Sequence, residues 1–247
     1  MGAILIEGRL SYLEQKVSNT LLGNAYPMLL KKDRFWMSWS ALKAKIWYNS
    51  NDHDPLKKAI LKLGQTSMIC IDDDKVFQNF NHLNAPRIIW GEDWFEYGYD
   101  HGLPQLLHEP EIFALIDEST QAKFESKGVL LLYELILPFK KNAKYHGLTS
   151  VWTPEFLRLR LGLSDFYKSF RELRRKALEK YIAVINKESE IFIEMLEPQR
   201  QGRKVVGIQF QVSDNPNNVQ AKLPWIQSQT DLLEAMETAI VKEYVSV

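Results

Sequence analysis

The chain has 247 residues, of which 45% are apolar and 25% charged, so it can bury a substantial core as one large domain or two small ones. No apolar run approaches the roughly 20 residues that a membrane span needs. The start of the chain also lacks the basic and apolar regions of a secretion signal. We therefore expect a cytoplasmic protein with no membrane partner. The single cysteine, Cys70, excludes an intramolecular disulfide and a cysteine-type metal cluster.

Charge is distributed unevenly along the chain, although 31 basic and 31 acidic residues balance overall. The net charge is +5 over 1–70, −9 over 71–122, +7 over 123–212 and −3 over 213–247. Two separated basic stretches in a neutral chain are typical of proteins that bind a polyanion such as nucleic acid.

Hydrophobic periodicity and capping residues predict three helices and a hairpin in the first third of the chain. Ser11 and Glu14 fit a capping box, and Asp54 followed by Pro55 fits a helix N-cap and first turn. The predicted helices cover 11–25, 40–46 and 55–63, and the predicted strands cover 35–37, 67–71 and 76–80, with a turn at 72–74. The third helix is expected to end at Gly64 and to bury Leu56, Ala59, Ile60 and Leu63.

The acidic stretch 81–122 is less regular, and we interpret it as a junction. It is expected to hold a strand near 87–90 and a short helix near 110–116. An apolar helix follows over 127–137, which Pro138 is expected to end, and a basic loop spans 140–146.

The order of helices and hairpin recurs in the second half of the chain. Thr153 and Pro154 open a helix that Gly162 closes, and Ser164 is the expected cap of a longer helix over 165–186. Strands are expected over 191–195 and 206–212, with a turn over 198–202. On the second strand we expect Val206, Ile208, Phe210 and Val212 to share one face.

The predicted fold class is α+β, with two tandem winged-helix domains, each a helix-turn-helix unit followed by a β-hairpin wing. The expected boundaries are 1–120 for the N-terminal winged-helix domain, 121–213 for the C-terminal winged-helix domain that reads DNA, and 214–247 for a tail with an amphipathic helix.

The predicted helix over 165–186 has an apolar and a basic face. The residues expected to face the core recur at spacings of three and four: Phe166, Phe170, Leu173, Ala177, Tyr181 and Val184. Lys168, Arg171 and Arg175 fall within a ~60° arc on the opposite side, flanked by Arg174. An ordinary solvated basic face gives the same pattern. We favour DNA binding because the arc lies on the second helix of a helix-turn-helix, which such motifs place in the major groove.

Two further groups of basic residues are candidates for DNA contact. Arg200, Arg203 and Lys204 surround Gly202 in the predicted hairpin turn, where a wing contacts the DNA backbone. Charges also gather at hairpin turns that bind nothing. A weaker group lies on the predicted helix over 55–63, where a solvated face is nearly as good an explanation: Lys57, Lys58 and Lys62.

No catalytic constellation stands out, and we expect no enzymatic activity, no cofactor and no metal. The sequence lacks a P-loop, and its five histidines include no His-x-His pair for a metal-dependent nicking enzyme. The acidic run 72–74 lacks the spaced partners of a calcium loop and is expected to be a solvated turn. We interpret Tyr97 and Tyr99 beside His101 as a buried or interfacial aromatic cluster rather than a nucleophile site.

Three stretches of the chain, spanning about residue 10 to 212, carry the motifs of a known family. The first comprises Glu14-Gln15-Lys16, Asn19, Leu21-Leu22 and Asn24-Ala25-Tyr26. The second runs from Lys127 to Tyr133-Glu134. The third comprises Phe166-Tyr167, Phe170, Leu173-Arg174-Arg175, Leu178, Ile185-Asn186, Gly202-Arg203-Lys204-Val205 and Ile208-Gln209-Phe210. In these motifs the chain resembles the iteron-binding plasmid replication initiator (Rep) proteins, which are built from two winged-helix domains.

The resemblance implies a bacterial plasmid protein that binds repeated origin sites in double-stranded DNA as a monomer, opens the duplex and recruits the host initiator and replicative helicase. It also implies a homodimer, formed through the first winged helix, in equilibrium with the monomer and able to repress its own promoter. The family's base-reading helix maps to Lys168, Arg171, Arg174 and Arg175, and its wing contacts map to Arg200, Arg203 and Lys204. The alternative is a winged-helix transcriptional repressor without a replication role, which shares the fold and the basic helix.

The tail contains a pattern that resembles the short peptide by which bacterial proteins dock on the sliding clamp, formed by Gln229, Asp231, Leu232 and Leu233. The favoured alternative is that Thr230 caps an amphipathic helix through these leucines.

Overall fold

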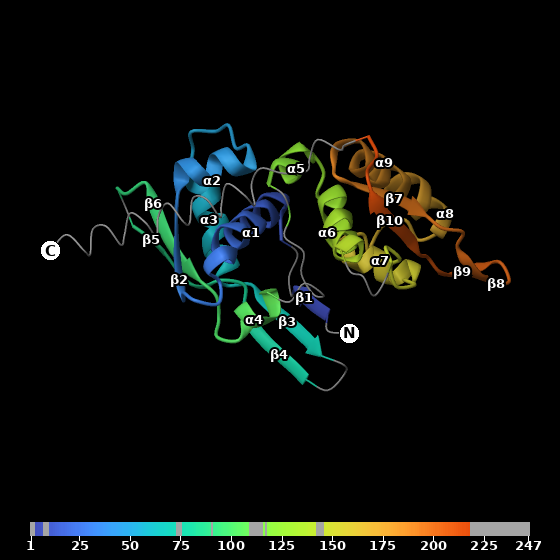
Figure 1. Ribbon diagram of the computed structural model, residues 1–247, viewed down its shortest axis with the longest axis horizontal. Coiled ribbons are helices and arrows are strands. Elements are labelled where there is room, and N and C mark those ends of the chain that lie inside the picture. The colour runs from blue at the N-terminus through green and yellow to red at the C-terminus, as the bar shows by residue number, and fades with distance from the viewer. Residues whose placement is uncertain are drawn as a thin grey trace.

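The protein builds two hydrophobic cores that follow one another along the chain. The ribbon in Figure 1 shows the helices and strands that surround them. A computed structural model describes residues 3–6, 10–72, 76–89, 91–108, 116, 118–141 and 146–217. The first core gathers buried side chains between Leu10 and Leu107, and the second gathers those between Phe124 and Val212. Within the described residues, no helix is long and apolar enough to cross a membrane.

The first core lies between helices and a three-stranded sheet. The helices are α1 (Tyr12–Ala25), the 3-10 turn η1 (Tyr26–Met28), α2 (Trp39–Ile46), α3 (Asp54–Leu63) and α4 (Leu103–His108). This sheet has the order β2-β6-β5, formed by β2 (Arg34–Ser38), β5 (Asn84–Ile88) and β6 (Trp94–Gly98). A second sheet has the order β1-β3-β4, formed by β1 (Ala3–Ile6), β3 (Ser67–Asp72) and β4 (Val76–Asn81).

The predicted helix starts in this half are confirmed at α1 and wrong in one detail at α3. Ser11 and Glu14 form the expected capping box, with 2.7 Å between the Ser11 amide and the Glu14 carboxylate. At α3, Asp54 lies inside the helix instead of capping it. The Asp52 carboxylate takes over part of the capping role, because it accepts a hydrogen bond from the Asp54 amide at 2.9 Å. The four expected apolar residues of α3 are buried, and Gly64 follows its last turn as predicted.

Two strands of the first half, β1 and β6, were not predicted from the sequence. β1 pairs with β3, and β6 pairs with both β2 and β5. β6 carries the aromatic cluster inferred from the sequence, since Tyr97 is fully buried and its ring lies 5.8 Å from that of Phe35. The predicted helix near 110–116 lies almost wholly outside the described residues, and its one described residue, Ile116, belongs to no regular element.

The second core is built from α6 to α9 and a small sheet, and α5, which precedes them, packs against α1 and α2. The helices are α5 (Glu118–Lys123), α6 (Lys127–Lys141), α7 (Pro154–Arg160), α8 (Phe170–Leu173), the π-helical turn η2 (Arg174–Leu178) and α9 (Glu179–Glu188). The strands are β7 (Ile191–Met195), β8 (Gln199–Gln201), β9 (Lys204–Gly207) and β10 (Phe210–Asp214). With the first half, this bears out the α+β class and gives each half the helices and β-hairpin expected of a winged-helix unit.

Helix α6 continues through Pro138 to Lys141, so the predicted stop at Pro138 was wrong, as was the assignment of Lys140 to a loop. A proline removes one helical hydrogen bond, and packing can compensate for that loss. Beyond it, the Phe139 ring lies 5.6 Å from that of Trp152, and Lys140 forms an ion pair with Asp214 at 3.0 Å. These contacts hold the last turn against the sheet.

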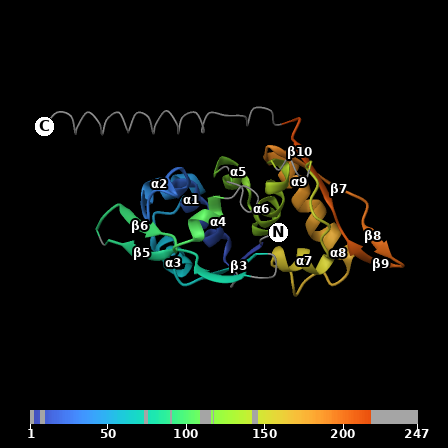
Figure 2. The same cartoon turned by 60° about the horizontal axis from the view of Figure 1, so that its bottom comes forward.

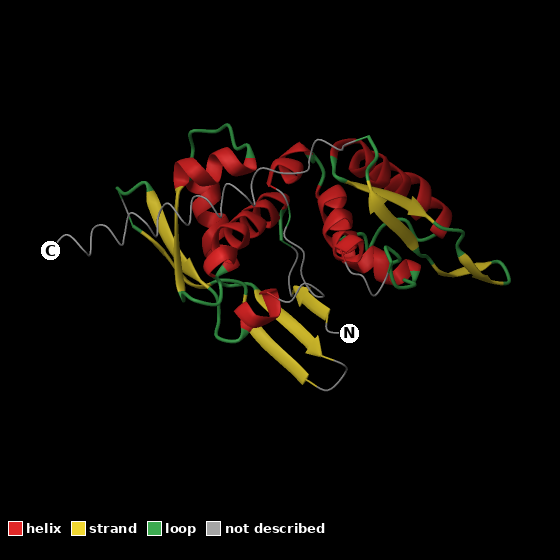
Figure 3. Cartoon of the chain, viewed as in Figure 1, coloured by secondary structure: helices red, strands yellow, loops and turns green. Residues whose placement is uncertain are grey.

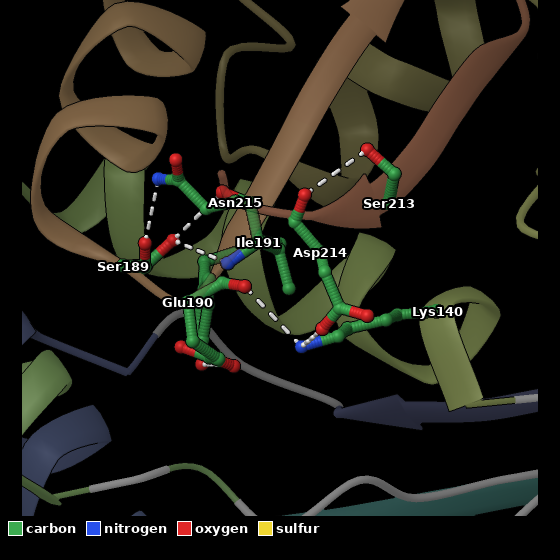
Figure 4. A network of polar contacts seen from close by, with 8 residues as sticks. Lys140, Ser189, Glu190, Ile191, Ser213, Asp214 and Asn215 are labelled. Atoms are coloured by element: carbon green, nitrogen blue, oxygen red, sulfur yellow. Dashed lines mark hydrogen bonds and ion pairs between the residues drawn. The ribbon is translucent and has the colours of Figure 1, made fainter. Parts of the chain in front are cut away.

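Figure 4 shows the polar network that anchors this end of α6. The Lys140 ammonium also donates to the Glu190 carbonyl at 3.2 Å. Ser189 and Asn215 complete the network, because the Asn215 side chain donates to the Ser189 carbonyl at 2.9 Å. The network ties the end of α9 to both neighbouring strands.

The helix predicted over 165–186 begins only at Phe170, so Ser164 is not its cap. Ser169 caps it instead, with its hydroxyl accepting a hydrogen bond from the Glu172 amide at 3.2 Å. The chain before it cannot be helical, because Tyr167 has a φ of 52°.

The π-helical turn changes which residues of this helix face the core. A π turn adds one residue to a helical turn, so the apolar face shifts along the sequence. The residues buried here are Leu173, Ala177, Leu178 and Ile185. The expected core positions at Phe166 and Val184 were wrong, since these side chains are 57% and 36% exposed.

The predicted strand over 206–212 is divided in two. β9 pairs with β8 to form a hairpin that projects beyond the sheet, as Figure 3 shows, and β10 pairs with β7. Between them, Ile208 bridges to Trp152. The interruption changes the register, so Val205 rather than Val206 is buried on β9, and the single shared face that we expected was wrong.

Candidate nucleic-acid interface

A basic groove lies between α7, the start of α8 and the β8–β9 hairpin, which we call the wing. The groove has a volume of about 580 Å³. α7 contacts both α8 and β9, which brings the helix-turn-helix and the wing to one place. The groove is lined by Pro154, Glu155, Arg158, Lys168, Ser169, Phe170, Arg171, Arg174, Arg200, Arg203, Lys204 and Val205. Seven of these side chains are basic and one is acidic, so the groove fits an anionic ligand.

Six of the seven DNA-contact candidates from this half of the sequence line the groove together. They are Lys168, Arg171, Arg174, Arg200, Arg203 and Lys204. Arg175 is exposed on the π-helical turn but does not line the groove. The predicted helical arc was wrong for Lys168, because this residue precedes the helix and reaches the groove from the connecting segment.

The basic residues of the groove differ in how far neighbouring acids neutralise them. Arg174 forms an ion pair with Glu179 at 2.8 Å. Within the described part of the chain, Arg171, Arg200 and Arg203 have no carboxylate partner. These three guanidinium groups keep their full hydrogen-bonding capacity for an external ligand. Arginine is suited to phosphate and to guanine, because its planar group donates two parallel hydrogen bonds.

Arg158, which sequence analysis missed, shapes one wall of the groove. Its side chain is only 13% exposed and forms an ion pair with Glu155 at 3.0 Å. It also donates to the carbonyl oxygens of Tyr167 and Lys168 at 3.3 and 3.4 Å. Arg158 therefore fixes the connecting segment that carries Lys168. Nothing in the local sequence distinguishes it from an exposed arginine in the last turn of a helix.

The lysines of α3 lie on the other winged-helix unit, and two of the three are paired with acids. Lys57 lies 3.5 Å from Asp54, and Lys62 lies 3.0 Å from Glu14. Burial acts to raise the pKa of Glu14, but hydrogen bonds from Ser11 and Lys62 lower it overall. Lys58 is exposed. This face is less available to an anion than the groove of the second unit.

The elements that carry the DNA-contact candidates of the two units lie along one edge of the molecule in Figure 2. That edge carries α3 and β3 of the first unit, followed by α7, α8 and the wing of the second. A long ligand such as duplex DNA can therefore follow both units.

Two protein-family descriptions match the sequence. "Initiator Replication protein, WH1" matches residues 3–137, and "Initiator Rep protein, WH2" matches residues 155–212. A comparison with curated protein sequences found no match.

The fold is similar to two solved structures. One is the Pi initiator protein in complex with iteron DNA, at 16% identity, covering 87% of this chain and 98% of that chain with a TM-score of 0.60. Another is domains 2 and 3 of RctB, at 9% identity, covering 85% of this chain and 90% of that chain with a TM-score of 0.53.

Proposed function

The chain belongs to the family of initiator replication proteins with two winged-helix domains, and we propose that it initiates plasmid replication by binding directly repeated sites in duplex DNA. The observation that carries this proposal is the basic groove, where Arg171 and the wing arginines face one ligand site. The iteron DNA in the similar Pi structure supports repeats as the ligand.

In this proposal the second unit docks with the first turns of α8 in the major groove. An α-helix about 10–12 Å across fits that groove, and Arg171 lies on its exposed side. The wing then reaches the adjacent backbone, where Arg200, Arg203 and Lys204 neutralise phosphates. The first unit adds backbone contacts through α3, with Lys58 as its exposed lysine.

The protein itself acts by binding, without a catalytic step of its own. Opening of the origin, recruitment of the host initiator and helicase, and repression of its own promoter as a dimer are the further parts of this proposal. A plasmid that carries the repeats next to the gene, and no other initiator, should replicate only when the gene is intact. If the protein were a repressor without a replication role, this plasmid would fail to replicate whether or not the gene is intact.

The variant Arg171→Ala tests the groove directly. We expect its affinity for a duplex that the wild-type protein selects from a random library to fall by about 1–3 kcal/mol, with relaxed preference at one base pair. Fluorescence anisotropy measures this loss. Lys187→Ala is the matched control, because it removes the same charge from an 80%-exposed side chain at the far end of the helix. Equal binding by Arg171→Ala and Lys187→Ala would contradict the assignment.

A further inference from the structure

The two winged-helix units meet at a junction made of polar contacts between α1 on one side and α5 and α6 on the other. Helix α1 packs against α5. At the start of α1, the Tyr12 hydroxyl donates to the Phe124 carbonyl, and the Lys127 ammonium donates to the Leu10 carbonyl. Further along, Asn19 donates to the Gln121 side chain at 2.7 Å, and Gln121 donates to the Lys16 carbonyl at 3.3 Å.

Glu134 of α6 lies at the centre of this junction. The Gln15 amide nitrogen is 3.0 Å from each oxygen of its carboxylate. The Asn19 amide nitrogen donates to Oε1 at 2.7 Å. One carboxylate of α6, a helix whose apolar side chains belong to the second core, thus receives hydrogen bonds from two side chains that lie one turn apart on α1 of the first unit.

This arrangement restricts rotation between the units. Hydrogen bonds to a carboxylate are directional and stronger than those between neutral groups. Contacts between domains of one chain are otherwise expected to allow relative motion. Asn19 is also held by its bond to Gln121, which limits its rotamers. Glu134 can keep both amide donors only at one angle between α1 and α6.

That angle matters if one duplex is to contact both units. Helix α3, proposed to contact the DNA backbone, and helix α8, proposed to read the major groove, lie along one edge of the molecule in Figure 2. The major groove faces the same direction once per turn, about 34–36 Å or 10.5 base pairs. A rotation at the junction would therefore move α3 away from its DNA contacts while α8 stays bound in the major groove.

We propose that Glu134, held by Gln15 and Asn19, is a positioning residue that sets the spacing between the two DNA segments that the units contact. The inference rests on the proposed function and goes beyond it, because it assigns the fixed spacing to three side chains that touch no DNA.

The test uses the full-length protein and a duplex that wild type selects from a random library, with the two contacted segments located by footprinting. Insertions of about one to five base pairs between the segments, up to half a helical turn, change their spacing. We expect about five inserted base pairs to weaken wild-type binding at least tenfold. For Glu134→Ala and Asn19→Ala, we expect the same insertion to weaken binding less than about threefold.

Controls separate positioning from stability and from DNA contact. Both variants should bind a duplex that carries only the segment of the second unit as tightly as wild type does. The protein with both Glu134→Ala and Asn19→Ala should tolerate insertions no better than either single variant, because each single substitution already breaks the same junction. Glu96→Ala is the matched control, since it removes a carboxylate that pairs with Arg34 at 2.9 Å inside the first unit, and it should keep the wild-type spacing.

Two outcomes are distinct failures. If wild type selects no duplex sequence, the proposed function fails, and this inference fails with it. If wild type binds and the folded Asn19→Ala and Glu134→Ala proteins keep its sensitivity to insertions, the inference alone is overturned.

Discussion

At the scale of single residues, two ionisable groups, the buried His82 and the half-buried Glu134, have pKa values displaced in opposite directions. Burial lowers the pKa of His82, in the first core, from 6.5 to about 4. Burial raises the pKa of Glu134 from 4.5 to about 7, although the amides of Gln15 and Asn19 act in the opposite direction. The positive charges of Arg160 and Lys127 also favour the ionised form of Glu134.

These displacements have opposite consequences for stability. Between pH 6.5 and 4 the unfolded chain binds more protons at His82 than the folded protein does, so acid reduces stability through this group. Between pH 7 and 4.5 the folded protein binds more protons at Glu134, so acid increases stability there. The two effects offset each other over much of this range.

Replacing His82 should separate the two effects. When the pH is lowered from 7.5 to 5, wild type should lose stability through His82 and the variant should not. We therefore expect the free energy of unfolding of His82→Gln to rise by about 2 kcal/mol relative to that of wild type. Urea denaturation at both pH values measures the difference. His101→Gln, at an exposed histidine, is the control and should leave the pH dependence unchanged. The same pH dependence in His82→Gln and wild type would show that His82 is not the group responsible.

At the scale of elements, the start of α8 combines a structural cap with a place in the basic groove. Ser169 accepts a hydrogen bond from the Glu172 amide and also lines the groove. Position 169 can therefore affect helix stability through the capping hydrogen bond and ligand binding through the charge of any side chain placed there.

Two substitutions at Ser169 should separate these roles. Ser169→Ala removes the cap and should lower the free energy of unfolding by about 1 kcal/mol. Ser169→Asp keeps a capping oxygen, so stability should stay near wild type, but its charge should weaken duplex binding about tenfold. Thermal unfolding and anisotropy measure the two effects. Ser38→Asp is the matched control, because Ser38 caps α2 away from the groove. If the Ser169→Asp protein binds DNA as tightly as wild type does, the DNA does not occupy this groove.

At the scale of the whole molecule, the wing should govern the salt dependence of binding more than its sequence preference. Removing one protein–phosphate interaction should reduce the slope of log affinity against log salt by about 0.9. Arg200→Ala and Lys204→Ala should therefore flatten the slope for selected and random duplexes alike. Anisotropy titrations at several salt concentrations measure it, with Lys187→Ala as the control. If both wing variants keep the wild-type slope of log affinity against log salt, the wing does not contact DNA phosphates.

The sequence by itself determined the α+β class, the two winged-helix units and most helices, because periodicity and caps arise from contacts within a few residues. It also identified Arg171 and the wing residues as basic groups on exposed elements. The late start of α8 was missed because the left-handed backbone of Tyr167 is held by Arg158 from another helix. Local patterns do not contain that contact.

Only the tertiary structure decided which of these groups act together. It brought Lys168 into the groove and left Arg175 outside it, since the connecting segment and the π-helical turn changed the helical phase. It also revealed the junction at Glu134, whose partners lie 115 and 119 residues away in the sequence. The Glu134 carboxylate gains these hydrogen bonds only when distant segments have packed, so its role depends on the folded chain and not on its neighbours in sequence.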